Sequence, residues 1–416
     1  MRTEHQPFRL PCARGQGAIV DTFSGIDRFL RDLLAGIGLH PDFVAVLLKF
    51  AAAAALGVTA ASIAIILIWA ERKLVARIQD RLGPNRVGPF GLLQTIADAL
   101  KLLTKEVLIP QGADRIVFQL APLLVVASVV AVWAVMPLAP GLVGSDVNVG
   151  LLYVISIGAV GTLGVMLAGM SSNNKYALLG AFRTVAQLVS YAVPMILALL
   201  VPALLAGSMG MADIVEAQSE FPFLLLAPLA AVIFLVSSIA EVGRAPFDLL
   251  EAESEIVAGY HIEYSGMAFG MFFVGEFVHA FTISALTTVI FLGGWQGPGV
   301  QDYPLLGLLY FVLKTGLVYF VVIWVRGTFP RIRIDQMNAF NWKFITPLAL
   351  VVLMVTAVVD KLPVGGGLNR LLWHLSANAV VVLLTLVALR VYARAVREAA
   401  APGEPEQAPR PEPAGG

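Results

Sequence analysis

The sequence predicts an all-α polytopic membrane protein, a bundle of about nine transmembrane helices with one amphipathic surface helix. Of its 416 residues, 58% are hydrophobic and only 13% are charged, and the mean hydropathy is +0.83. This composition is far too apolar for a soluble globular protein of this size. The chain also contains a series of long, nearly charge-free apolar runs, and a run of about 20 such residues is long enough to cross a bilayer as a helix.

The predicted spans follow one another with mostly short connections. They are, in order, residues 44–70, 115–137, 150–170, 181–206, 223–241, 267–293, 304–325, 344–359 and 371–393. The eighth run is the shortest and only marginally long enough to cross. The first 40 residues carry Arg and Asp throughout and show no signal peptide, so we expect the first span to act as the targeting signal.

Lys and Arg are concentrated in alternate loops. The loops after spans two, four and six contain none, which predicts that the N-terminus lies outside and the main functional loops are cytoplasmic. The predicted organisation is an outside N-terminal arm (1–43), an eight-span core (44–360) with cytoplasmic loops 71–114 and 242–266, an extra C-terminal span (361–393) and a disordered cytoplasmic tail (394–416) rich in Pro, Glu, Gly and Ala.

Charge and cysteine content exclude several functions. The 28 basic and 28 acidic residues give no net charge, so no basic field exists that would recruit nucleic acid. The single cysteine, Cys12, and five scattered histidines cannot supply a four-ligand zinc or iron–sulfur site. We therefore predict no metal and no redox centre in this chain.

The first inside loop begins with basic residues, which often act only as anchors to anionic lipid. Residues 83–89 contain two glycines and two prolines (Gly-Pro-Asn-Arg-Val-Gly-Pro), which predicts a shaped loop suited to a protein partner or a polar ligand. Residues 90–107 then form an amphipathic pattern, so a helix along the membrane surface is expected. Asp98 on its polar face could pair with Lys101 one turn on. Such a helix could lie on lipid or could cover a lateral opening for an amphiphile.

The third inside loop, residues 241–266, is acidic. Four carboxylates fall within eight residues, and Asp248, Glu251 and Glu255 would share one face of a helix. Like charges this close raise one another's pKa unless a cation such as Arg244 intervenes. An ordinary solvated acidic loop would give the same pattern, and the spacing is not that of a calcium loop.

Three ionisable residues interrupt the predicted spans: Glu276 and His279, one turn apart in the sixth, and Lys314 near the middle of the seventh. Placing such a group in a membrane costs at least ~2.5 kcal/mol, so it generally faces protein or water and serves transport or proton transfer. Structural ion pairing is the alternative.

Two longer runs resemble a known family. Residues 91–106 (GLLQTIADALKLLTKE) and 246–259 (PFDLLEAESEIVAG) look like the signature motifs of one membrane subunit of proton-pumping NADH:quinone oxidoreductase, respiratory complex I, the subunit at the junction of the two arms. Glu71-Arg72 and residues 83–86, 260–266 and 293–297 add to a likeness that spans about residues 44–360.

This resemblance implies a chain of the bacterial plasma membrane that forms the quinone channel and couples quinone reduction to proton translocation, with no catalytic residue of its own. The implied substrate is quinone. No cofactor is bound covalently, and NADH, FMN and the iron–sulfur clusters belong to partner subunits. The implied partners are the peripheral-arm subunits of the quinone site, small membrane subunits and membrane lipid.

Site residues are carried over by motif. The quinone-channel candidates are Arg72, Asp98, Lys101, Arg244, Phe247, Asp248, Glu251, Glu253, Glu255 and Glu263. The proton-coupling candidates are Glu241, Glu276 and Lys314. The sequence departs from the family at Ala192, where many relatives carry Glu, so one acidic link of the family's proton route is missing.

Three other functions remain open beside the one that the resemblance implies. The first is the equivalent membrane subunit of a membrane-bound hydrogenase. The second is a stand-alone cation/proton antiporter that uses Glu276 and Lys314, although transporters usually show duplicated halves and no internal repeat is visible here. The third is a purely structural anchor, which predicts that Glu276 and the acidic loop tolerate neutralisation.

Overall fold

The computed structural model describes residues 40–248, 257–300, 303–362 and 367–400, and these contain helices and no β-strand. The α-helices are α2 (Pro41–Ile78), α3 (Gln94–Thr104), α4 (Arg115–Val132), α5 (Gly150–Ser171), α6 (Lys175–Ala206), α7 (Met211–Glu216), α8 (Phe223–Leu226), α9 (Pro228–Val242), α11 (Gly266–Phe291), α12 (Pro304–Thr328), α13 (Ile334–Phe340), α14 (Thr346–Lys361) and α15 (Leu368–Ala400). Three short segments, η1 (Pro89–Gly91), η2 (Gly259–His261) and the π-helical η3 (Asn341–Ile345), complete the fold. The predicted N-terminal arm up to residue 39 lies outside the described residues.

Within this part of the chain, eight helical stretches are long and apolar enough to cross a membrane. The prediction of an all-α polytopic membrane protein is therefore confirmed. The last of them, α15, continues to Ala400, past residue 394 where the sequence predicts the tail to begin.

The predicted fifth span, 223–241, is broken into α8 and α9. Pro228 has no N–H to continue the helix and disfavours helical geometry in the residue before it, and Ala227 accordingly leaves the helix at φ −134° and ψ 63°. The 15 residues of α9 rise only about 22 Å at 1.5 Å per residue, which is less than the ~30 Å hydrocarbon core. The fifth predicted span, rather than the eighth, is therefore too short to cross the bilayer as a single straight helix.

The eighth predicted span is longer than the sequence suggested. Helical structure runs without a break from Ile334 to Lys361, 28 residues in all, because the turn at 341–345 widens to a π-helix. Asn341 in this turn is fully buried and donates a hydrogen bond to the carbonyl of Ser190 on α6, 2.6 Å away. The predicted span began too late, at residue 344, because the length of the apolar run does not report the polar first turns of this helix.

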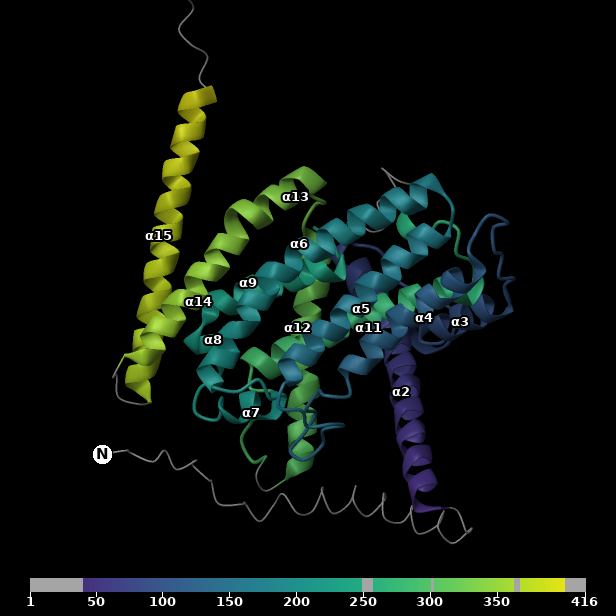
Figure 1. Cartoon of the computed structure of the whole chain (residues 1–416), viewed down its shortest axis with the longest axis horizontal. Coiled ribbons are helices and arrows are strands. Elements are labelled where there is room, and N and C mark those ends of the chain that lie inside the picture. Colours follow the sequence, from purple (N-terminus) through teal and green to yellow (C-terminus); the bar gives the residue numbers. More distant parts are fainter. Residues whose placement is uncertain (1–39, 249–256, 301–302, 363–366, 401–416) are drawn as a thin grey trace, which may run out of the picture.

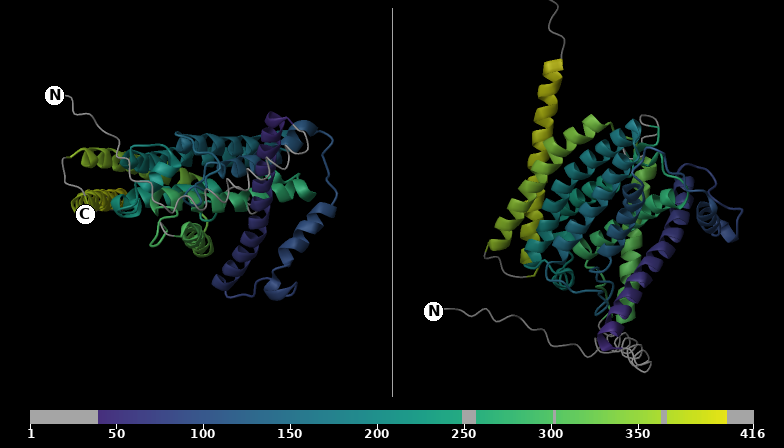
Figure 2. Two further views of the ribbon diagram at one scale, coloured as in Figure 1. Left: turned by 90° about the horizontal axis from the view of Figure 1, so that it is seen from below. Right: turned by 45° about the vertical axis from the view of Figure 1, so that its right-hand side comes forward.

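The helices pack around α11, which contacts α2, α4, α9 and α12 (Figure 1). On one side α6 packs between α5 and α9, and α14 and then α15 complete that edge of the bundle (Figures 1 and 2). The largest buried apolar cluster joins α6, α9 and the second half of α11. The amphipathic helix α3 lies against α2 and α11, as a helix beside the bundle rather than a span.

Candidate functional site

Charged side chains meet toward the end of the bundle at which α2, α9 and α12 end and α11 begins; Glu276 lies ten residues into α11. We call this end of the bundle the inner end, after the predicted side of its loops, and the opposite end, with the loop 292–300, the outer end. Glu71 comes from the last turns of α2 and is only 4% exposed. Arg244 follows α9 and is only 3% exposed. Burial of two ionised groups requires that each be paired.

Arg244 joins two carboxylates. Its Nη1 lies 3.0 Å from Glu71 Oε1, and its Nε lies 3.1 Å from Glu276 Oε1 of α11. Arg326 of α12 forms a second ion pair with Glu71, and the Tyr319 hydroxyl donates a hydrogen bond of 3.2 Å to Glu71 Oε2. Two guanidinium groups thus balance two carboxylates, and we call these five residues the inner charge network.

The guanidinium of Arg244 is held from a third side by an aromatic ring. It lies 4.5 Å from the centroid of the Phe277 ring, a distance at which the ring attracts a cation. Its Nη2 is buried without a hydrogen-bond partner among the described residues. The Nη2 group of Arg244 can therefore donate a hydrogen bond to an additional acceptor.

The turn after α9 sets the position of Arg244. Gly243 takes a left-handed conformation at φ 74° that ends the helix, and the N–H of Phe247 then donates to the carbonyl of Arg244 at 2.9 Å. The Phe247 ring packs against Tyr191 of α6 with centroids 5.3 Å apart. From the segment of chain after α12, the N–H of Ile332 donates to the Pro246 carbonyl at 3.0 Å. Phe247 is therefore a buried anchor of the turn.

Glu241 lies one residue before the end of α9. Its Oε2 is buried with no hydrogen-bond partner among the described residues, and a Cβ added to Gly158 of α5 would stand 3.9 Å from its Oε1. A buried carboxyl oxygen without a partner indicates a site for water or a mobile donor. The structure thus places Glu241 inside the bundle, close to the turn that carries Arg244.

The remaining acidic candidates are distributed along the third loop. Asp248 is half-buried and has an interaction partner, whereas Glu251, Glu253 and Glu255 lie outside the described residues. Glu263 accepts a hydrogen bond of 2.6 Å from Asn174 Nδ2, which ties the end of the loop to the start of α6. Nearby, burial lowers the pKa of His261 to about 4, so this side chain is neutral at physiological pH.

Arg72 and Asp98 pair across two helices. Arg72 Nη1 lies 2.6 Å from Asp98 Oδ2, so the partner of Asp98 is on α2, while Lys101 acts on Asp98 through its charge. Burial raises the pKa of Asp98, but hydrogen bonds from Arg72 and Gln94 and the charges of Arg72 and Lys101 more than offset it, and the pKa lies below its usual value. This pair holds the surface helix α3 against the end of α2.

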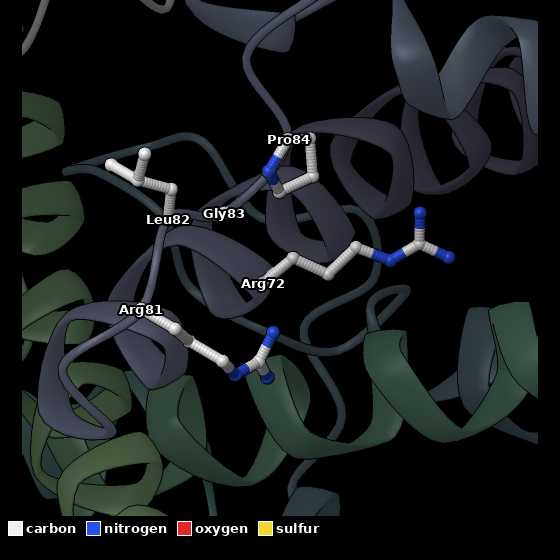
Figure 3. A pocket seen from close by; sticks show the side chains of 5 residues that line it. All are labelled: Arg72, Arg81, Leu82, Gly83 and Pro84. Atoms are coloured by element: carbon white, nitrogen blue, oxygen red, sulfur yellow. The ribbon is translucent and has the colours of Figure 1, made fainter.

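A pocket of about 340 Å³ opens beside this pair. It is lined by Arg72, Arg81, Leu82, Gly83 and Pro84 (Figure 3). The loop around it is shaped by Gly91, whose φ is +75° and whose added Cβ would lie 2.3 Å from the Pro84 carbonyl oxygen. Leu82 is 81% exposed, so an apolar side chain lines the pocket together with two basic ones.

Lys314 lies at the other end of the bundle. Its Nζ donates to the carbonyls of Leu292 (2.8 Å), Gly294 (3.2 Å) and Gln296 (2.8 Å). Leu292 is 16 residues beyond Glu276, which is about 24 Å along a helix. Lys314 therefore caps the outer end of α11, and the structure does not bring it together with Glu276.

Sequence reasoning identified Arg244 and Glu276 but missed three members of the inner charge network, Glu71 as an ion-pair partner, Tyr319 and Arg326. Their position in the sequence could have indicated them. Glu71 and Arg326 directly follow predicted spans at the inner side, and Tyr319 lies in the last turns of such a span. Among the described residues, no group of three or more His, Cys, Asp or Glu is placed to hold a metal ion.

Comparison with known proteins gives one family. The sequence model of a family described as NADH dehydrogenase matches residues 50–357, a range that contains the whole inner charge network and ends before α15. Three bacterial relatives are each named as a subunit of NADH-quinone oxidoreductase. That of Dehalococcoides mccartyi (strain CBDB1) is 52% identical over 293 residues, 70% of this chain and 81% of the relative. That of Geobacillus kaustophilus is 49% identical over 293 residues, with 70% and 88% covered, and that of Rhodospirillum centenum is 48% identical over 296 residues, with 70% and 88% covered.

Proposed function

This chain belongs to the NADH dehydrogenase family, and we propose that, as a membrane subunit of an NADH-quinone oxidoreductase, it forms the quinone channel and couples quinone reduction to proton translocation. The inner charge network is the observation that carries the proposal. It concentrates buried, paired charges at the end of the bundle that carries the predicted cytoplasmic loops 71–114 and 242–266.

Quinone chemistry explains why such a network is useful. Reduction of a quinone adds two electrons and two protons, so the head group needs nearby charge compensation and proton donors, while its tail needs an apolar passage. Arg244 forms ion pairs with Glu71 and Glu276 at the same time. A further negative charge that develops nearby competes for this guanidinium, and a carboxylate that loses its cation more readily takes up a proton. This competition is the proposed link between electron transfer and proton uptake.

The passage for the tail is proposed along α3 and the adjoining loop. Apolar side chains that are more than 40% exposed follow the surface helix and its approach; they are Phe90, Leu92, Leu93, Ile96, Leu100 and Leu103. The pocket beside Arg72 adjoins the end of α2, and α3 packs against α2. Because Arg72 also pairs with Asp98, the basic side of the pocket is held in place by the same helix that offers the apolar surface.

The proposal places the redox groups in partner subunits. NADH, FMN and the iron–sulfur clusters act there, and quinone is the substrate that this chain delivers. The acidic loop and the pocket would face the peripheral arm, and the N-terminus would lie outside the cell membrane with the main loops in the cytoplasm.

Purification of the tagged chain from its native membranes tests this assignment. Copurification of an NADH-oxidising arm with inhibitor-sensitive NADH:quinone activity is expected, whereas a nickel-containing partner would identify the hydrogenase alternative. The antiporter alternative predicts cation/proton exchange by the chain alone in proteoliposomes. The structure does not favour the antiporter alternative, because the Lys314 ammonium donates to three backbone carbonyls at the outer end, far from Glu276.

A further inference from the structure

Gln187 of α6 is fully buried and binds two carbonyl oxygens at once. Its Nε2 donates to the carbonyl of Ala240 at 2.7 Å and to that of Phe247 at 2.7 Å. Both neighbours are acceptors, so only the amide NH₂ can face them and the orientation of the side chain is fixed.

These two carbonyls stand at either end of the turn that carries Arg244. Ala240 is in the last turn of α9, where its carbonyl also accepts from the N–H of Gly243 at 3.2 Å, and Phe247 closes the turn through its hydrogen bond to Arg244. A single amide therefore bridges residues 240 and 247. Movement of the turn relative to α6 would break one or both bonds.

The same helix also positions the far end of the acidic loop. Gly180 of α6 lies so close to Gly259 that an added Cβ would stand 2.7 Å from the Gly259 carbonyl carbon. Gly180 and Gln187 are seven residues apart, which is about 10 Å along the helix. Thus α6 fixes Phe247 and Gly259, the residues on either side of the predicted acidic cluster.

A second buried glutamine makes a different set of hydrogen bonds. Gln218, at the outer end, is 2% exposed. Its Nε2 donates to the carbonyls of Ile214 and Val289, and its Oε1 accepts from the N–H groups of Phe223 and Gly293. Gln187 instead leaves its buried Oε1 without a hydrogen-bond partner among the described residues. Gln187 therefore holds both ends of one turn through its two donors alone, whereas Gln218 uses its donors and its acceptor to join four backbone groups.

We propose that Gln187 is a positioning residue for quinone reduction, which acts by holding the Arg244–Phe247 turn at a set distance from α6. The inference rests on the proposed function. It assigns Gln187 no contact with the quinone, and its effect is transmitted through Arg244 and Phe247.

The test uses the complete, purified enzyme complex with Gln187→Leu and Gln187→Glu, and the matched pair Gln218→Leu and Gln218→Glu. Gln187→Leu removes both hydrogen bonds, and we expect kcat/KM for quinone to fall at least tenfold while NADH oxidation by ferricyanide, which bypasses quinone, is unchanged. Gln187→Glu can donate only when its carboxyl is protonated. Its kcat/KM relative to the native enzyme should therefore recover as the pH is lowered from about 8 to about 6.

The Gln218 variants should lose thermal stability and keep kcat/KM within about twofold, with a native pH profile. The inference is overturned if the Gln187 variants do the same. If Gln187→Leu does not assemble, the pH profile of assembled Gln187→Glu decides, and a flat ratio to the native enzyme rejects the role. A native complex without NADH:quinone activity would instead reject the proposed function, so the two failures are distinct.

Discussion

The two ends of the bundle bury positive charge in different ways. At the inner end, Arg244 is neutralised by the carboxylates of Glu71 and Glu276, with Arg326 on the first of them. At the outer end, Lys314 is surrounded by three backbone carbonyls of the loop 292–296. Carbonyls cannot take up protons, whereas carboxylates can.

The inner end therefore has groups that can exchange protons, whereas the outer end has groups that hold backbone segments together. Beside Lys314, the side-chain amide of buried Gln218 makes four hydrogen bonds, and the second half of α11 packs into the largest apolar cluster; the hydroxyl of Thr315 is buried there without a partner among the described residues. Around Arg244, buried polar atoms of Glu241, Gln187 and Arg244 itself lack partners among the described residues. Unpaired donors and acceptors beside ionisable carboxylates allow the inner end to rearrange during a reaction, whereas the bonds of Lys314 and Gln218 hold the loop 292–296 in place at the outer end.

The largest effect is expected from Arg244→Leu, which removes the cation shared at the inner end. Loss of one partner of a buried ion pair costs about 3–5 kcal/mol; Glu71 keeps Arg326, but Glu276 loses the guanidinium. NADH:quinone activity per assembled complex should fall at least hundredfold. Arg244→Lys keeps the charge without the two-pronged geometry and should retain an intermediate rate; equal, near-native rates for both variants would contradict a role for the network.

Glu276→Gln sharpens the contrast by removing proton exchange while keeping the shape of the side chain. We expect proton translocation per electron to fall markedly and the quinone reduction rate to drop by about tenfold or more. Acidification of vesicles measured together with NADH oxidation checks both. A variant with native coupling would favour a structural ion pair at this position.

Lys314→Met tests the outer end, where the expected loss is of stability. The three carbonyls lose a charged donor, at a cost of about 2 kcal/mol, so thermal inactivation of the complex should occur at lower temperature. The ratio of protons translocated to electrons transferred should change far less than in Glu276→Gln. A loss of coupling as large as that of Glu276→Gln would return Lys314 to the proton route.

The smallest effect is expected from Asp98→Asn at the edge of the inner end. The Arg72–Asp98 pair is partly exposed, so it contributes at most about 1 kcal/mol. The pKa of Asp98 is lowered in the folded protein; its contribution is therefore complete above the ordinary Asp pKa and is lost as the pH falls through the lowered value. Hydrogen exchange of α3 should be faster in the variant at neutral pH and equal to native in strong acid.

The sequence was sufficient for the helices and for some site residues, and the limits have physical causes. Apolar runs locate most spans because burial in lipid requires them, but they cannot show that Pro228 divides the fifth run or that polar residues from Ile334 onward extend the eighth. Arg244 and Glu276 stand out as charges at unfavourable positions. Glu71, the partner of Arg244, lies 173 positions away from it in the sequence, and no local periodicity reports such a contact. The same limit applies to Asp98. Helical spacing predicted Lys101 as its ion-pair partner, but in the fold Asp98 pairs with Arg72 of α2.

Photolabelling of the intact complex with an azido-quinone tests the central claim most directly. If the inner end receives the quinone, mass spectrometry of digests will place adducts in residues 71–114, in residues 242–266 and at the inner ends of α2, α9 and α11, and excess unlabelled quinone will suppress them. Adducts confined to the outer loops 207–222 and 292–303 would contradict the account.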